Sequence, residues 1–159
     1  MSEDLHIISG TKEEQYEALL PQIAGLLEGE NDLIANLANI SAALKAQFGW
    51  LWVGFYLLKE EELVLGPFQG PIACTRIKKG RGVCGTAWAK NSTIIVEDVE
   101  KFPGHIACSS LSKSEIVVPF YLNGAFAGVL DADSEYLSHY DAIDKKYLET
   151  LVAFIKKQI

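Results

Sequence analysis

The chain has 159 residues, of which 49% are hydrophobic and 22% are charged, so it can bury the core of one domain without a disulfide or a metal. Its formal net charge is −7, and no run of Lys or Arg exceeds two residues. This excludes a nucleic-acid surface and binding to an anionic membrane, because both need clustered cations. The charge favours a small ligand that carries a positive group.

Residues 1–15 have no basic start and no apolar core, so we predict that they are not a signal peptide. The longest apolar stretch, Trp50–Leu58, is far too short to span a bilayer. The three cysteines, Cys74, Cys84 and Cys108, are an odd number. We therefore expect a cytoplasmic protein in a reducing compartment, where a disulfide is transient and part of the chemistry.

Two helices are predicted at the start of the chain. Thr11 and Glu14 have the spacing of a capping box, and apolar residues then recur at helical spacing until about Gly29. Pro21 is expected to split or kink this helix, because proline has no backbone N–H. A second helix is predicted over residues 33–48.

The middle of the chain changes to the period of strands. Strands are predicted at residues 50–58, 62–68, 72–77, 92–99, 115–122 and 125–134. A short helix is predicted at residues 83–91. The polar stretch 100–115 shows no period and is expected to be a functional loop.

Asn123-Gly124, between the last two predicted strands, is a strong signal for a tight hairpin. A final amphipathic helix is predicted from about Asp141 to Lys157. The order of elements predicts an α+β fold with a central antiparallel sheet and flanking N- and C-terminal helices. We expect one domain over residues 1–159, in which residues 1–29 are an N-terminal helical segment.

The cysteine intervals of ten and twenty-four residues match neither a CxxC pair nor a zinc ribbon. Cys74, in a predicted strand, is equally well interpreted as a small buried residue or as a reactive one. Cys84 opens a predicted helix, whose N-terminal dipole favours a thiolate. Cys108 lies in the polar loop near His105 and is the best candidate for a reactive thiol, whereas His105 itself is interpreted as a surface residue. A metal site made from the cysteines and His105 is an alternative that the loose spacing disfavours.

Three acidic residues are candidates for a binding site. If the last strand persists, Asp131 and Asp133 lie on one face of it; alternatively the strand ends at Leu130 and both begin a solvated turn. Glu115 could likewise be a solvated charge at the start of a strand. The hairpin allows the three carboxylates to meet at one end of the sheet, where they cannot all ionise. Such a cluster can accept an ammonium group and donate a proton.

Trp52 and Tyr56 alternate along a predicted strand with Gly54 between them. A core stripe is the ordinary interpretation of aromatic residues at this spacing. The small residue between them leaves room, however, and a cavity walled by the two rings would suit a thioether or a methyl group.

The stretches WVGFYLL, LVLGPFQGPIACTRI, GRGVCGTAWA, FPGHIACSSLSKSEIVVP and GVLDADS resemble the free methionine-R-sulfoxide reductases. These are single GAF domains that reduce free, not peptide-bound, methionine-R-sulfoxide. The resemblance runs from about Asp32 to Leu151, so nothing is transferred to the segment before about Glu30. It implies a GAF-type fold and a homodimer. The three cysteines stand at the family's intervals.

By this resemblance, Cys108 attacks the sulfoxide and becomes a sulfenic acid, which Cys74 or Cys84 resolves as a disulfide. Cys74 is the preferred first partner. A thioredoxin-type dithiol then regenerates the thiols, and no cofactor or metal is implied.

The resemblance also implies the residues that hold the substrate. The acids Glu115, Asp131 and Asp133 bind the ammonium group and protonate or polarise the sulfoxide oxygen, and Trp52 and Tyr56 wall the methyl end of the pocket. Carboxylates so close should raise the pKa of an attacking thiol; His105, Lys113 or backbone amides are the candidates to offset this. The alternative function is a GAF sensor that binds a small ligand without chemistry.

Overall fold

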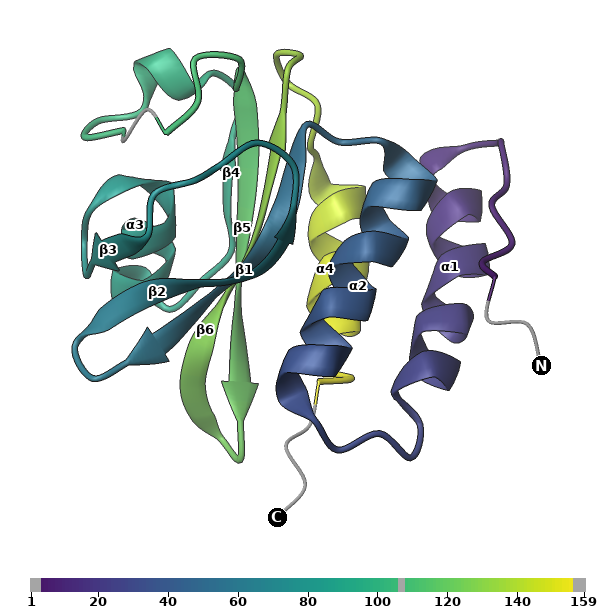
Figure 1. Ribbon diagram of the computed structural model, residues 1–159. Helices are drawn as coiled ribbons and strands as arrows, with labels where there is room; N and C mark the ends of the chain where they lie inside the picture. The colour runs from purple at the N-terminus through teal and green to yellow at the C-terminus, as the bar shows by residue number, and fades with distance from the viewer. Residues whose placement is uncertain (1–3, 106–107, 156–159) are drawn as a thin grey trace.

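The computed structural model describes residues 4–105 and 108–155, which form an antiparallel sheet with helices on both faces (Figure 1). Helices α1 (Lys12–Leu27), α2 (Leu33–Phe48) and α4 (Ala142–Val152) lie on one side of the sheet. Helix α3 (Gly82–Lys90) lies on the other side. Helices on both faces require both faces to be apolar, and each side of the sheet has its own buried cluster.

The sheet has six strands in the order β3-β2-β1-β6-β5-β4, and every neighbouring pair is antiparallel. Their bounds are β1 (Trp52–Lys59), β2 (Glu62–Gln69), β3 (Arg76–Lys78), β4 (Ile94–Val96), β5 (Ser114–Leu122) and β6 (Ala125–Ser134). A 3-10 turn, η1 (Val99–Lys101), follows β4. The predicted α+β fold with a central antiparallel sheet is thus confirmed.

The β5–β6 hairpin sets the register on which the site depends. Asn123 and Gly124 both have positive φ, 53° and 79°, as a tight two-residue hairpin turn requires. The pairing that follows places Glu115 opposite Asp133. The predicted hairpin is confirmed, and it brings two of the three acids directly across from each other.

Helix α1 begins at the predicted capping box. The Thr11 hydroxyl accepts from the Glu14 backbone N–H at 3.1 Å, and Glu14 Oε1 accepts from the Thr11 N–H at 3.0 Å. The prediction that Pro21 splits this helix is wrong, since α1 runs unbroken to Leu27. Pro21 lies on the exposed side, where packing of Leu19 and other buried residues on the opposite side can outweigh one lost backbone bond.

Three predicted element boundaries differ from the structure. Of the strand expected at 72–77, only the end belongs to a strand, β3, because residues 71–75 form a loop. Of the strand expected at 92–99, only the residues of β4 are in a strand. The last helix ends at Val152, and the predicted end at Lys157 lies outside the described residues. Within the described part of the chain, no helix has both the length and the apolar character needed to cross a membrane.

Candidate active site

The three acidic residues meet on the face of the sheet that carries α3. Strand β6 continues to Ser134, so the alternative in which it ends at Leu130 is wrong and Asp131 and Asp133 share one face. Glu115, opposite Asp133, joins them. Only 6% of Glu115 and 6% of Asp131 is exposed, and Asp133 is half-buried. The expected convergence of the three side chains is therefore present.

Burial raises the pKa of all three carboxyl groups, and the neighbouring carboxylates raise those of Glu115 and Asp133 further. Hydrogen bonds from Glu115 and from Cys84 oppose this shift at Asp131. Asp131 is therefore the member most readily ionised, and Glu115 and Asp133 hold their protons more firmly. The cluster thus combines one more acidic carboxyl group with two less acidic ones.

Cys84 lies in the first turn of α3, beneath this cluster. Its thiol is buried and not disulfide-bonded, and it donates to Asp131. The helix dipole was expected to favour a thiolate here, but burial and the nearby Asp131 and Glu115 carboxylates raise the pKa of Cys84 well above its usual value. That expectation is wrong, because desolvation outweighs the partial charge of a helix end.

The other two cysteines form a disulfide. Cys74 and Cys108 are joined across a Cα–Cα distance of 5.6 Å, within the usual range for a disulfide. Cys74 lies in the 71–75 loop rather than within a strand, and Cys108 is exposed in the segment before β5. The structure thus pairs two residues that are thirty-four positions apart in the sequence. A metal site that uses both their thiolates is incompatible with this state.

Trp52 and Tyr56 fix the loop that carries Cys74. Trp52 Nε1 donates to the Pro71 carbonyl at 3.0 Å, and the Tyr56 hydroxyl donates to the Cys74 carbonyl at 2.8 Å. Their rings are stacked, with centroids 6.0 Å apart. Both residues line the pocket beside the acids, as expected, but their role in holding this loop was not foreseen.

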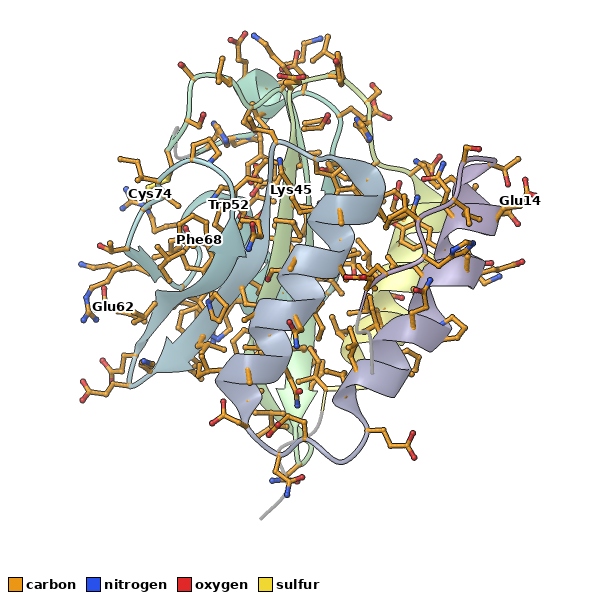
Figure 2. All side chains as sticks on the ribbon, turned by 45° about the vertical axis from the view of Figure 1, so that its right-hand side comes forward. Glu14, Lys45, Trp52, Glu62, Phe68 and Cys74 are labelled. Carbon is orange, nitrogen blue, oxygen red and sulfur yellow. A yellow bond between two sulfur atoms is a disulfide. The ribbon has the colours of Figure 1, made fainter. Side chains whose placement is uncertain are left out.

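Gly54 does not leave the empty space that the sequence suggested. A Cβ at Gly54 would lie 2.3 Å from the Cβ of Phe68, so β2 fills the position. The Phe68 ring stacks on Trp52 with centroids 5.2 Å apart. Figure 2 shows Trp52, Phe68 and Cys74 together on the side of the sheet away from α1 and α2.

One pocket brings most of these groups together. A single cavity is lined by the three acids, by Trp52 and Tyr56, by Cys108, and by Ala73, which precedes Cys74 in the chain. The cavity has a volume of about 60 Å³, several times the ~10–15 Å³ that one water molecule needs. Cys108 and the acidic cluster therefore face the same small, partly enclosed space, as they must if both act on one substrate.

Sequence reasoning did not single out several residues that line the pocket, and two of them bring polar groups to the site. Ser112 Oγ donates to Asp133 Oδ1 at 3.2 Å, and this bond connects the segment that carries Cys108 to the acids. Arg81 lies immediately before α3 and brings a guanidinium to the exposed rim of the pocket. Both stand in stretches that carry the family resemblance, but only the tertiary fold brings their side chains to the pocket.

Arg81 is a further candidate to offset the carboxylates beside a thiolate at Cys108, because both residues line the same pocket. His105 lines the pocket and is not simply a surface residue, but partial burial lowers its pKa, so it is neutral at pH 7. Lys113 is exposed and does not line the pocket. Among the described residues that line the pocket, Arg81 is thus the one Lys or Arg side chain.

Residues 29–156 match the family model of the GAF domain. A free methionine-R-sulfoxide reductase of Escherichia coli is 48% identical over 92% of this chain and 89% of its own length. GAF domain-containing protein A of Dictyostelium discoideum is 68% identical over 98% of this chain and 99% of its own.

Among solved structures, the free methionine-R-sulfoxide reductase of Neisseria meningitidis in complex with its substrate is 54% identical. It superimposes with a TM-score of 0.94 over 97% of this chain and 93% of that one. The match includes both the sheet and the helix that build the pocket. The chain therefore belongs to the family of GAF-domain proteins that includes the free methionine-R-sulfoxide reductases.

Proposed function

We propose that this protein reduces free methionine-R-sulfoxide to methionine, with its own cysteines as the immediate reductant. The observation that carries the proposal is the Cys74–Cys108 disulfide beside a pocket that holds three buried acids. A binding domain without chemistry has no need for a disulfide at this place. The names of close relatives support the same activity.

The pocket offers complementary groups to each part of a free amino acid. Asp131 is the anion to which the ammonium group binds, with Glu115 beside it. Arg81 and the N-terminus of α3, which has no side-chain cap, face the carboxylate. The rings of Trp52 and Tyr56 contact the S-methyl end. A peptide-bound residue has no ammonium group, so it is a poor substrate for this pocket.

Asp133 is the proton donor to the sulfoxide oxygen. Among the three acids it is the one least buried, and burial together with Asp131 raises its pKa, so that it holds its proton more firmly than an ordinary aspartate. Ser112 connects it to the segment that bears Cys108. A sulfoxide oxygen must be protonated before it can leave sulfur, so a neutral carboxylic acid is the useful form.

In the reduced protein, the Cys108 thiolate attacks the sulfoxide sulfur while Asp133 protonates the oxygen. The oxygen is transferred to Cys108 as a sulfenic acid, and methionine leaves with its sulfur reduced by two electrons. The Cys74 thiol then attacks the Cys108 sulfur, which forms the disulfide and releases water. A thioredoxin-type dithiol reduces this disulfide by exchange and becomes a disulfide itself.

Cys84 is a second candidate to resolve the sulfenic acid. Its burial and its raised pKa keep it as a thiol, which is a poor nucleophile, so Cys74 reacts first. The need for an external dithiol fits a cytoplasmic, reducing compartment. The family resemblance adds a homodimer, which sedimentation of the purified protein would test.

The decisive experiment compares the R and S epimers of methionine sulfoxide, each as the free amino acid and within a peptide, with a dithiol as reductant. We expect turnover of the free R epimer alone. The Cys108→Ser variant, with the same pocket, serves as the matched control and should be inactive. Comparable reduction of the peptide-bound form, or no reduction at all and no disulfide on substrate addition, would contradict the proposal; the second result would favour a sensor.

A further inference from the structure

A thiol and two carboxyl groups meet at the buried end of the pocket, apart from the disulfide. One ligand-type atom from each of Cys84, Glu115 and Asp131 lies within 4.8 Å of the other two. All three residues are buried. In the disulfide form, Cys84 carries the only thiol of the chain, since the other two cysteines are bonded to each other.

One atom of this cluster lacks a partner. Oδ1 of Asp131 is buried and has no hydrogen-bond partner among the described residues, although only 6% of Asp131 is exposed. Leaving a buried carboxylate oxygen unsatisfied is costly, so the site is arranged for a positive group that is absent from the protein itself. Asp131 lines the pocket, so such a group can reach it.

The donor set indicates which cations fit. Ammonium can use the carboxylates, but it gains little from a sulfur atom. A thiolate with two carboxylate oxygens suits Zn²⁺ or another thiophilic divalent ion, whereas Mg²⁺ and Ca²⁺ prefer oxygen ligands alone. Tetrahedral Zn²⁺ would hold its ligand atoms about 3.4 Å apart. The three atoms, which lie within 4.8 Å of one another, must therefore approach by up to about 1.4 Å to hold such an ion.

We propose that Cys84, Glu115 and Asp131 bind Zn²⁺ or a similar thiophilic divalent cation, and that this cation excludes the substrate. On binding, the Cys84 and Glu115 protons pass to solvent, and the dication compensates the charges that remain. The substrate's ammonium group and the cation both require Asp131, so only one can occupy the pocket. The exclusion of substrate rests on the proposed function, whereas the binding of the cation does not.

Binding is tested with Cd²⁺ alone as the probe on the disulfide form of the protein, which needs no turnover. Because Cys84 is then the sole thiol, the ultraviolet thiolate-to-cadmium absorption reports that residue. We expect one equivalent of Cd²⁺ to produce the band and Zn²⁺ to remove it. Absence of the band, or its persistence in Cys84→Ser, would overturn the proposal.

Two matched variants separate ligation from general negative charge. Asp131→Asn removes a ligand, and we expect it to weaken Cd²⁺ binding by about tenfold or more. Asp133→Asn changes a carboxyl group on the same strand and face that is outside the ligand set, so the loss of Cd²⁺ binding should be clearly smaller. Equal weakening by the two variants would refute specific ligation. Circular dichroism of each variant establishes that it is folded.

Competition tests the second half of the proposal. Free methionine should raise the apparent Kd for Cd²⁺ in proportion to its concentration, and N-acetylmethionine, which lacks the ammonium group, should not. Cd²⁺ binding that is indifferent to free methionine would overturn mutual exclusion. Cd²⁺ binding by a protein that reduces no sulfoxide would leave the cation site intact and contradict the proposed function only.

Discussion

The Tyr56 hydroxyl donates a hydrogen bond of 2.8 Å to the Cys74 carbonyl, and so it connects the centre of β1 to the loop that carries the resolving thiol. Because Trp52 holds the same loop through Pro71, the position of Cys74 depends on two rings of the sheet. If Cys74 resolves a sulfenic acid at Cys108, as proposed, a residue of the core positions the thiol that must react. This relationship can be tested by removing one atom, the hydroxyl oxygen of Tyr56.

We expect Tyr56→Phe to slow disulfide formation by roughly tenfold, because small errors in the position of a reacting group are costly. Loss of the hydrogen bond should also lower the free energy of unfolding by about 1 kcal/mol. Quenched single-turnover samples analysed by mass spectrometry measure the first effect. Tyr121→Phe is the matched control, since its hydroxyl contacts Asn91 on the surface. Wild-type disulfide formation in Tyr56→Phe would show that the bond does not position Cys74.

The two remaining cysteines should behave differently when replaced. Cys74→Ser should release one methionine per chain in a burst and then accumulate Cys108 as a sulfenic acid, and the slower regeneration of this acid should lower steady-state turnover about tenfold or more. Cys84→Ser should still form the Cys74–Cys108 disulfide, because that pair is already within bonding distance. Mass spectrometry distinguishes the added oxygen from the disulfide. If Cys74→Ser turned over like the wild type, Cys84 would be the first resolving residue.

The carboxyl groups are expected to separate binding from chemistry. Asp131→Asn removes the anion that meets the ammonium group and should raise KM by about 10- to 100-fold, the loss of one charged hydrogen bond. Asp133→Asn removes the proton donor and should lower kcat by about 10²-fold or more. Steady-state kinetics with the free R epimer give both constants. The opposite pattern would exchange the two roles.

Local signals predicted the parts of this fold that are fixed locally. The capping box at Thr11, the Asn123-Gly124 turn and the alternation that places Asp131 and Asp133 on one face are each visible within a few residues. The hairpin then brings Glu115 to them. This is why the acidic cluster could be predicted from the sequence before any coordinates.

The parts that the sequence did not predict depend on contacts between distant residues. Ile72–Cys74 has the composition of a strand, yet hydrogen bonds from Trp52 and Tyr56 hold the segment as a loop. Arg81 and Ser112 reach the pocket only when α3 and the segment that carries Cys108 pack beside β5 and β6. The raised pKa of Cys84 likewise follows from burial, which no local spacing reveals.

The buried acids should make stability depend on pH in an unusual direction. The pKa of Glu115 is raised in the folded protein, so the folded state keeps a proton that the unfolded state loses once the pH exceeds the ordinary value of a glutamate. Stability is then greatest below that ordinary value. It falls as the pH rises toward the raised one, by at most about 1.4 kcal/mol per pH unit for each proton.

Glu115→Gln removes this effect, because the amide does not ionise. We expect the variant to be more stable than the wild type at neutral pH and similar to it near pH 4, although it should bind substrate less well. Denaturant unfolding of the disulfide form at a series of pH values measures the difference. A constant gap between the two curves would mean that Glu115 does not bind this proton.

Helix α1, which ends before the GAF match begins, is tied to the domain through one buried acid. Asp144, only 1% exposed, accepts from Tyr16 at 2.5 Å and from Lys12 Nζ at 2.6 Å. Removing the cation leaves this carboxylate with one partner fewer in a place that water cannot reach. Lys12→Met should therefore lower the free energy of unfolding by about 3 kcal/mol.

The comparison that tests this is Glu17→Gln, on the same helix, where a single hydrogen bond to the Tyr147 hydroxyl lies at the surface. Its effect should stay within about 0.5 kcal/mol, because water replaces an exposed partner. KM should be unchanged in both variants, since α1 and the pocket lie on opposite faces of the sheet. A Lys12→Met protein as stable as Glu17→Gln would show that Asp144 is satisfied without the lysine, and that α1 is held by its apolar residues alone.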